Sequence, residues 1–249
     1  MTQELSGRVA IVTGAGRNIG RGIALALADG GAAVVVNARS NLKEAERVAG
    51  EIERAGGQAL AVAADVAAAE AVNKMVAAAA EKFGRIDILV NNAAVRVEQA
   101  FEQMSLEEWR AVTSVILDGA FNCVQACLPH LKKSGAGAIV NIGGLSAHTG
   151  AAGRAHVVTA KAGLIGLTRA LAHELAPDGI RVNTVTPGLM SAPRAAGAPE
   201  PQHHSLVHAL AGRRGEPSDI AAAVRFLCGP GASFITGQNM QVNGGTYLG

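Results

Sequence analysis

A glycine-rich stretch near the start of the chain places the strongest constraint on its fold. A short apolar run, Val9–Val12, predicts a buried strand, and a helical apolar pattern starts at Ile23. Backbone N–H groups in a turn between strand and helix point at phosphates, and glycine lets the chain approach closely. This context predicts a dinucleotide pyrophosphate site. Its candidate residues are Gly14, Arg17, Asn18, Ile19 and Gly20.

Apolar runs alternate with helical patterns along almost the whole chain of 249 residues. Runs of this kind, separated by helices, predict a parallel sheet covered on both faces, and right-handed crossovers make it doubly wound. We therefore predict one α/β Rossmann domain over residues 1–249, with about seven strands. The expected strands are Val9–Val12, Ala33–Val36, Ala59–Ala63, Ile86–Val90, Ala138–Ile142, Val182–Val185 and Asn239–Val242.

Charge and cysteine content argue against several classes of protein. The net charge of +2 comes from interspersed residues, which predicts no nucleic-acid or membrane surface. Met1–Gly7 contains no apolar signal region, and no stretch of about 18 residues is both apolar and uncharged, so we expect no membrane span. Cys123, Cys127 and Cys228 are too few and scattered for a disulfide framework. We expect a reduced, cytoplasmic protein.

The end of the second expected strand bears on the choice of cofactor. A protein that selects NAD places a carboxylate there, about 20 residues past the first glycine, to bind the ribose 2′-hydroxyl. This chain has no acid at that point and supplies Arg39, while Arg17 could reach the same region. Two guanidiniums suit a 2′-phosphate, which favours NADP(H). The alternative is that Arg39 is a solvated surface residue.

With these residues in view, the chain resembles the short-chain dehydrogenase/reductase family over its whole length. The glycine turn matches the family motif, except that Asn18 replaces the middle glycine. The subgroup that it most resembles contains 3-oxoacyl-carrier-protein reductases and related NADPH reductases. The resemblance implies cofactor contacts at Asp65 and Val66 (adenine), at Asn91 and Ala93, at Pro187 and Gly188 (nicotinamide), and at Lys161 (nicotinamide ribose).

The family's catalysis rests on Asn, Ser, Tyr and Lys, and this chain keeps one of the four. Alignment places Lys161 on the lysine, but Val157 on the tyrosine, Gly144 on the serine and Ile116 on the asparagine. The chain's only tyrosine, Tyr247, lies in the C-terminal tail. A positioned general acid is worth about 10²–10⁴-fold and one oxyanion donor about 10²–10³-fold. An ordinary ketone reduction would therefore be slow without substitutes.

Residues near Lys161 are candidates for those substitutes. Arg154 lies about two turns earlier on the same helical face; it can stabilise an enolate or bind a carboxylate but cannot donate a proton at neutral pH. His156 adjoins the missing tyrosine position and suits acid–base chemistry, unless it points into packing. His148 or Ser146, in the loop after the fifth strand, could donate to a substrate oxygen, unless they satisfy the loop's own backbone.

Residues 189–212 are loop-like, and the resemblance makes this region the substrate lid. His204 and His208 have a spacing that can bind a metal, and His203 lies beside them, but only Glu200 is nearby to complete a site. We therefore predict a solvated lid without metal.

Two expected helices, Leu106–Leu131 and His156–Leu175, are too apolar for one-sided burial. We expect the sheet to cover one face and another subunit the other. The resemblance implies a homotetramer.

Three hypotheses for function follow. The first is an NADPH-dependent reductase with a rebuilt site that acts on a C=O, C=N or activated C=C bond of a small molecule. An iminium substrate would need little acid, and a conjugated enone could use Arg154 or His148. The second is a catalytically silent NADP(H)-binding protein, a sensor or a partner subunit. The third is a lyase or epimerase that uses bound dinucleotide without net redox change.

Overall fold

The computed structural model describes residues 3–191 and 208–249. A parallel sheet forms its frame, with seven strands in the order β3-β2-β1-β4-β5-β6-β7. This order confirms the predicted doubly wound Rossmann sheet. The strands are β1 (Val9–Val12), β2 (Ala33–Ala38), β3 (Ala59–Ala63), β4 (Ile88–Asn91), β5 (Ala138–Ile142), β6 (Arg181–Pro187) and β7 (Asn239–Val242).

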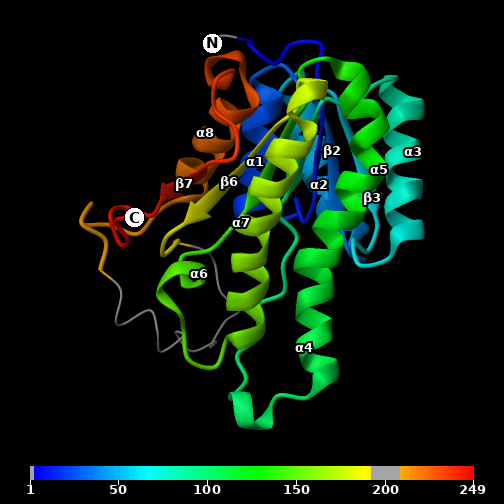
Figure 1. Cartoon of the computed structure of the whole chain (residues 1–249). Coiled ribbons are helices and arrows are strands. Elements are labelled where there is room, and N and C mark those ends of the chain that lie inside the picture. The colour runs from blue at the N-terminus through cyan, green and yellow to red at the C-terminus, as the bar shows by residue number, and fades with distance from the viewer. Residues whose placement is uncertain (1–2, 192–207) are drawn as a thin grey trace.

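Helices cover both faces of the sheet (Figure 1). Helices α1, α2 and α8 share one buried cluster with the sheet, and α3, α5 and α7 share another on the opposite face. In Figure 1, α4 extends beyond the edge of the sheet where α6 also lies. The helices are α1 (Asn18–Asp29), α2 (Leu42–Arg54), α3 (Ala69–Phe83), α4 (Leu106–Thr113), α5 (Gly119–Ser134), α6 (Ser146–Thr149), α7 (Ala155–Leu175) and α8 (Pro217–Cys228).

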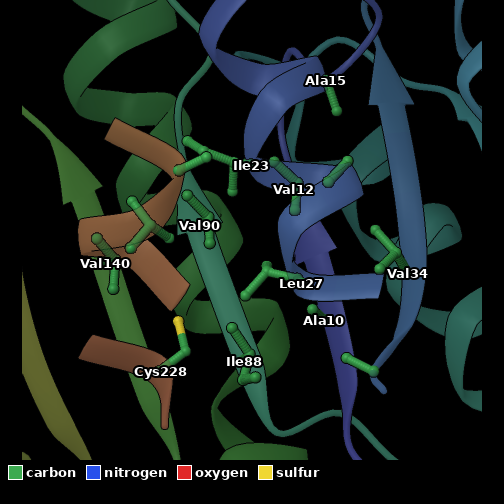
Figure 2. Close-up of a cluster of buried hydrophobic side chains, with 14 of the residues drawn as sticks. Ala10, Val12, Ala15, Ile23, Leu27, Val34, Ile88, Val90, Val140 and Cys228 are labelled. Carbon is green, nitrogen blue, oxygen red and sulfur yellow. The ribbon is translucent and has the colours of Figure 1, made fainter. Parts of the chain in front are cut away.

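The core divides by strand alternation, because successive side chains of a strand point to opposite faces. Ala10 and Val12 of β1 pack with Ile23 and Leu27 of α1, as Figure 2 shows. Ile11, between them, belongs to the cluster on the other face. Strands buried on both sides must be apolar throughout, which explains the unbroken apolar runs in the sequence.

Several predicted boundaries differ from the structure. β2 continues to Ala38 rather than ending at Val36, and β6 spans Arg181–Pro187 rather than Val182–Val185. β4 begins at Ile88 rather than Ile86, because the Asp87 carboxylate is fully buried and accepts a hydrogen bond from the backbone N of Val9 (2.9 Å). The single helix expected at Leu106–Leu131 is α4 and α5 joined by a π-helical turn, Ser114–Asp118.

The combined helical run Leu106–Ser134 is the one described segment that is long and apolar enough to cross a membrane by length and composition. Our sequence analysis found no such stretch because Asp118 interrupts it, whereas a test that tolerates one or two charges accepts it. Part of the run, α5, contacts α3 and β4 within the fold. Core helices pass the same test, so it does not identify a span.

Candidate active site

The candidate site lies where β1 and β4 end, at the switch point of the strand order. The turn after β1 requires its glycines. Gly14 has φ +61°, and a Cβ on Gly20 would collide with the Gly14 carbonyl oxygen and the Asn92 side chain. Asn18, which replaces the family's middle glycine, has φ +48°, a left-handed conformation that Asn tolerates. The turn therefore keeps the shape that suits a pyrophosphate.

Polar side chains that our sequence analysis did not single out hold this turn. Asn92 Nδ2 donates to the carbonyls of Thr13 (2.8 Å) and Gly14 (3.0 Å). Thr13 Oγ1 accepts from the backbone N of Asn92 (2.9 Å) and Ala93 (3.0 Å). Asn37, at the end of β2, accepts from Gly14 N (3.2 Å). Their sequence signal is a polar residue at the end of each apolar strand.

The two arginines assigned to a 2′-phosphate are both exposed, Arg17 at the N-cap of α1 and Arg39 directly after β2. Of the adenine pair, Asp65 is half-buried and accepts from Ala67 N (3.0 Å), while Val66 is buried. These positions are compatible with the predicted cofactor contacts, which remain predictions.

Asn91 differs from Asn92 in the direction of its side chain. Its Nδ2 donates to Asn141 Oδ1 (2.9 Å), and Asn141 Nδ2 donates to Thr168 Oγ1 (2.8 Å). The Asn91 Oδ1 atom is buried without a hydrogen-bond partner among the described residues. The amide thus links β4 to β5 and α7 inside the protein.

Lys161, the residue predicted at the family's lysine position, has only 7% of its surface exposed. Its Nζ donates to the carbonyl of Ile142 at the end of β5. Burial lowers its pKa to about 7, and repulsion from Arg96 and Arg154 adds to the shift. Our sequence analysis did not single out Arg96 as a neighbour of Lys161, because an isolated arginine in a loop carries no periodic or motif signal.

The three residues that our alignment predicts at the family's asparagine, tyrosine and serine positions differ in what surrounds them. Ile116, inside the π-helical turn, and Val157, on α7, are buried in one apolar cluster. Gly144 adjoins open space, since a Cβ built there would have Lys161 Cγ as its nearest neighbour, at 3.7 Å. Ile116 and Val157 are thus part of hydrophobic packing, whereas Gly144 has room for a side chain.

The two histidine candidates are engaged within the protein. His148 Nε2 lies 2.9 Å from Asn239 Nδ2 and 3.3 Å from Gln241 Nε2 of β7, and its ring stacks on Tyr247 with 4.9 Å between centroids. Burial, and secondarily Arg169, lowers the pKa of His148. A neutral ring that accepts from these amides carries its proton on Nδ1.

His156 is fully buried at the start of α7. Its Nδ1 accepts from the backbone N of Val157 (3.0 Å), and its Nε2 has no hydrogen-bond partner among the described residues. The burial matches the packing alternative for this residue; a role toward substrate stays a prediction.

Most of the expected lid, including His203, His204 and Glu200, lies outside the described residues. At its base, Ser191 N donates to Gly215 O (2.7 Å), and a cavity of about 450 Å³ opens beside Gly188. A Cβ on Gly188 would lie 2.6 Å from Asn243 Cα, so the turn after β6 requires glycine there. The described part of the chain contains no cluster of three metal-ligating residues.

The fold and its glycine turn define a dinucleotide-binding Rossmann protein. Residues 14–247 match a family model described as enoyl-(acyl carrier protein) reductase. The 3-oxoacyl-[acyl-carrier-protein] reductase FabG of Staphylococcus aureus is 41% identical over 96% of this chain and 98% of its own. A 3-oxoacyl-[acyl-carrier-protein] reductase of Synechocystis is 41% identical over 98% of each chain. A crystal structure of a putative short-chain alcohol dehydrogenase from Sinorhizobium meliloti superposes with a TM-score of 0.92, at 39% identity over 99% of this chain and 98% of that chain.

The chain therefore belongs to the short-chain dehydrogenase/reductase family of oxidoreductases. The comparison confirms the family resemblance drawn from the sequence motifs.

Proposed function

We propose that this protein is an NADPH-dependent reductase with a non-standard active site, which reduces a C=O, C=N or activated C=C bond of a small molecule. The observation that carries the proposal is a contrast within one site. The cofactor side has the glycine turn, the Thr13–Asn92 bonds and Lys161, whereas the positions aligned with the family's two hydroxyl groups are Gly144 and Val157, and Arg96 and Arg154 act on Lys161 instead. The reductase names of its relatives support the same reaction class.

The residues suggest how such a site would work. The glycine turn would hold the pyrophosphate, Arg17 and Arg39 the 2′-phosphate, and Lys161 the nicotinamide ribose. When bound, the nicotinamide supplies hydride. Arg154 stabilises negative charge that develops on the accepting group. Lys161, whose pKa is about 7, can hold a proton and release it near neutral pH, which a guanidinium cannot do.

One observation favours the silent NADP(H)-binding protein as a second candidate. Ile116 and Val157 belong to the same buried apolar cluster. Both residues align with polar residues of the family, and both present only hydrocarbon side chains. A protein that binds the cofactor without turning over a substrate needs no polar group at these two positions.

Consumption of NADPH by the purified protein tests the proposal. Simple ketones, conjugated enones and cyclic imines would be compared, with NADH in place of NADPH as the control. We expect turnover of enones or imines, and loss of most of it in Lys161→Met and Arg154→Gln but not in Arg110→Gln, a change at an exposed arginine of α4. No turnover on any substrate, with NADPH still bound tightly, would favour the silent protein.

Restoring the family's groups provides a complementary test. The double variant Gly144→Ser/Val157→Tyr should gain ketone reduction by about tenfold or more over the wild type, because it supplies a donor and an acid beside Lys161. The single variant Gly144→Ser is the matched control, since the open space there accepts a hydroxymethyl group without an acid being added.

We also propose that the protein is a homotetramer. Phe121 on α5 and Leu106 on α4 have 53% and 54% of their surfaces exposed, an arrangement that a neighbouring subunit would cover. Light scattering coupled to size-exclusion chromatography would measure the mass in solution.

A further inference from the structure

A chain of amide side chains runs from the C-terminal segment to His148. Asn243, which is buried, donates from Nδ2 to Gln241 Oε1 (3.1 Å), and Gln241 Nε2 lies 3.3 Å from His148 Nε2. Asn239 Nδ2 reaches the same ring nitrogen at 2.9 Å. Each amide has one accepting oxygen and one donating nitrogen, so the direction of one link fixes the direction of the next. We call Asn243 and Gln241 the amide relay.

Two backbone groups fix the direction of the amide relay at its start. The Gly245 N–H, which can only donate, lies 2.9 Å from Asn243 Oδ1. The Tyr247 carbonyl, which can only accept, lies 3.1 Å from Asn243 Nδ2. Both groups orient the Asn243 amide in the same way, so its nitrogen faces Gln241. Gln241 therefore turns its oxygen toward Asn243 and its N–H toward His148.

This direction determines which nitrogen of His148 carries the proton. The N–H groups of Gln241 and Asn239 both point at Nε2, and a ring nitrogen that faces two donors must be an unprotonated acceptor. The neutral ring then carries its proton on Nδ1. Burial, and secondarily Arg169, lower the pKa of His148, and a charged ring would also direct an Nε2–H at the two amides. The ring is therefore neutral at pH 7.

The Nδ1–H group of His148 is an unused donor of fixed direction. Within residues 3–191 and 208–249, the hydrogen bonds of the ring are those made at Nε2. The half-buried ring also stacks on Tyr247, with 25° between the two planes. Hydrogen bonds at one edge and an aromatic ring on one face hold the imidazole in place. A donor fixed in this way needs no reorganisation when an acceptor arrives.

The relay and the ring lie at the edge of the candidate site. His148 is on α6, in the segment that follows β5. In the same segment, Leu145 N donates to Pro187 O (3.2 Å), which joins it to the turn predicted to contact the nicotinamide. Gln241 and Asn243 both line the cavity of about 450 Å³ beside that turn. The unused donor is thus close to where a bound substrate would meet the cofactor.

We infer that Asn243 and Gln241 are positioning residues that hold His148 as the Nδ1–H tautomer, and that His148 donates this N–H to the carbonyl oxygen of a ketone or enone substrate. A fixed neutral donor stabilises an oxygen on which negative charge develops and keeps its own proton. It does not suit an iminium nitrogen, which has no lone pair to accept. The contact with substrate rests on the proposed reductase function, whereas the tautomer does not.

Proton–nitrogen correlation spectra of the full chain, with isotope-labelled histidine, test the tautomer. His148→Asn assigns the signals. We expect the wild-type ring at pH 7–8 to carry its proton on Nδ1 alone. In Gln241→Glu a carboxylate oxygen faces Nε2, so the proton should move to Nε2 and the pKa of His148 should rise by about 1 or more. Gln238→Glu, the same change at an exposed glutamine just before β7, is the matched control and should leave these signals unchanged.

Asn243→Asp tests the relay without a change beside the ring. Aspartate still accepts from Gly245 N but has no N–H for Gln241, so the Gln241 amide should reverse and present its oxygen to His148. The proton should again move to Nε2. Circular dichroism checks the folding of each variant, and either variant gives a reading if the other does not fold. Mixed tautomers in the wild type, or the wild-type tautomer in a folded variant, would overturn the relay.

Reduction of cyclohex-2-enone by NADPH tests the contact with substrate. His148→Leu removes the donor and should lower kcat/KM by about 100-fold. His148→Asn places an amide N–H near the Nδ1 position and should stay within about tenfold of wild type. Reduction of a protonated cyclic imine should be insensitive to both changes. Equal losses of enone reduction in the two variants, or no loss in either, would overturn the contact.

The two proposals fail separately. No turnover of any substrate, with the proton of His148 on Nδ1 alone, would remove the reductase and keep the relay. Titration with cyclohex-2-enone in the presence of NADP⁺ would then decide the contact, because an Nδ1–H signal that is unchanged at saturation would exclude it. Turnover of enones with mixed tautomers of His148 would keep the reductase and remove the relay.

Discussion

The two edges of the sheet, at the amino and the carboxyl ends of its parallel strands, differ in what surrounds their charged side chains. At the amino edge, the fully buried Asp87 accepts hydrogen bonds from Val9 N, Ser134 and two nitrogens of Arg85. At the carboxyl edge, Arg96, Arg154 and Lys161 repel one another. The first arrangement stabilises the fold, because each acceptor is satisfied where water is excluded. The second disfavours the protonated form of Lys161, because burial and the like charges of Arg96 and Arg154 both lower the pKa of its amine.

The largest effect is expected from Asp87→Asn. The amide cannot accept from all of the donors that now surround the carboxylate, so the free energy of unfolding should fall by about 3 kcal/mol. Urea unfolding at pH 7 measures it. Although burial alone would raise the pKa of Asp87, its bonds to Arg85, Ser134 and Val9 hold it below the ordinary 3.8. The wild-type advantage should therefore persist above that pH and disappear as the pH falls through the lower folded value.

Asp29→Asn is the matched control for this prediction. Asp29 pairs with Arg225 (2.5 Å), but 48% of its side-chain surface is exposed, and such pairs contribute about 0–1 kcal/mol. If Asp87→Asn lowered the free energy of unfolding no more than Asp29→Asn does, the buried hydrogen bonds of Asp87 would not stabilise the fold more than an exposed ion pair.

The next effect concerns the carboxyl edge and has the opposite sign. Lys161 has a folded pKa of about 7 against an ordinary 10.5, so between these values the unfolded chain binds more protons than the folded one. Stability should therefore rise with pH across this window. Lys161→Met should be more stable than wild type at pH 6–7, by about 2 kcal/mol, with the gap closing toward pH 10.

Urea unfolding at several pH values would measure this gap. Lys132→Met, at a partly exposed lysine of α5, is the control and should run parallel to wild type. If the free energy of unfolding of Lys161→Met also ran parallel to that of wild type across these pH values, burial of the Lys161 amine would not destabilise the fold.

The smallest effect is expected at Asn18. Because its φ is +48°, Asn18→Gly should change the free energy of unfolding by less than about 0.5 kcal/mol, whereas Asn18→Val should lose about 1–2 kcal/mol. The affinity for NADPH should follow the same order, since the turn is the expected phosphate site. Equal effects of the two variants would show that the left-handed conformation does not constrain this position.

Most of the fold could be predicted from local patterns in the sequence. Four of the expected strands have the predicted bounds, and in Val9–Val12 and Ala138–Ile142 every residue is buried, as a strand covered on both faces requires. The π-helical turn at Ser114–Asp118 could not be foreseen, since one extra residue in a helical turn hardly alters the apolar pattern. The start of β4 was displaced by a carboxylate whose partners come from β1 and α5.

The site was predictable only where it is local. The glycine turn is contiguous, and its conformation follows from residue type. The Asn92 bonds to Thr13 and Gly14, the stacking of Tyr247 on His148, and the approach of Arg96 to Lys161 join distant segments. Local sequence patterns do not reveal such pairings, because their partners come together only in the folded chain.

The burial of the cysteines has a practical consequence. Cys123, Cys127 and Cys228 are enclosed in the core, and burial raises the pKa of Cys123 and of Cys228 to about 12. At pH 8 all three are shielded thiols that react poorly with maleimides. A cysteine introduced at Gly144, where space is open beside Lys161, would be labelled selectively. A fluorophore there would report occupancy of the site directly, with the native cysteines left in place.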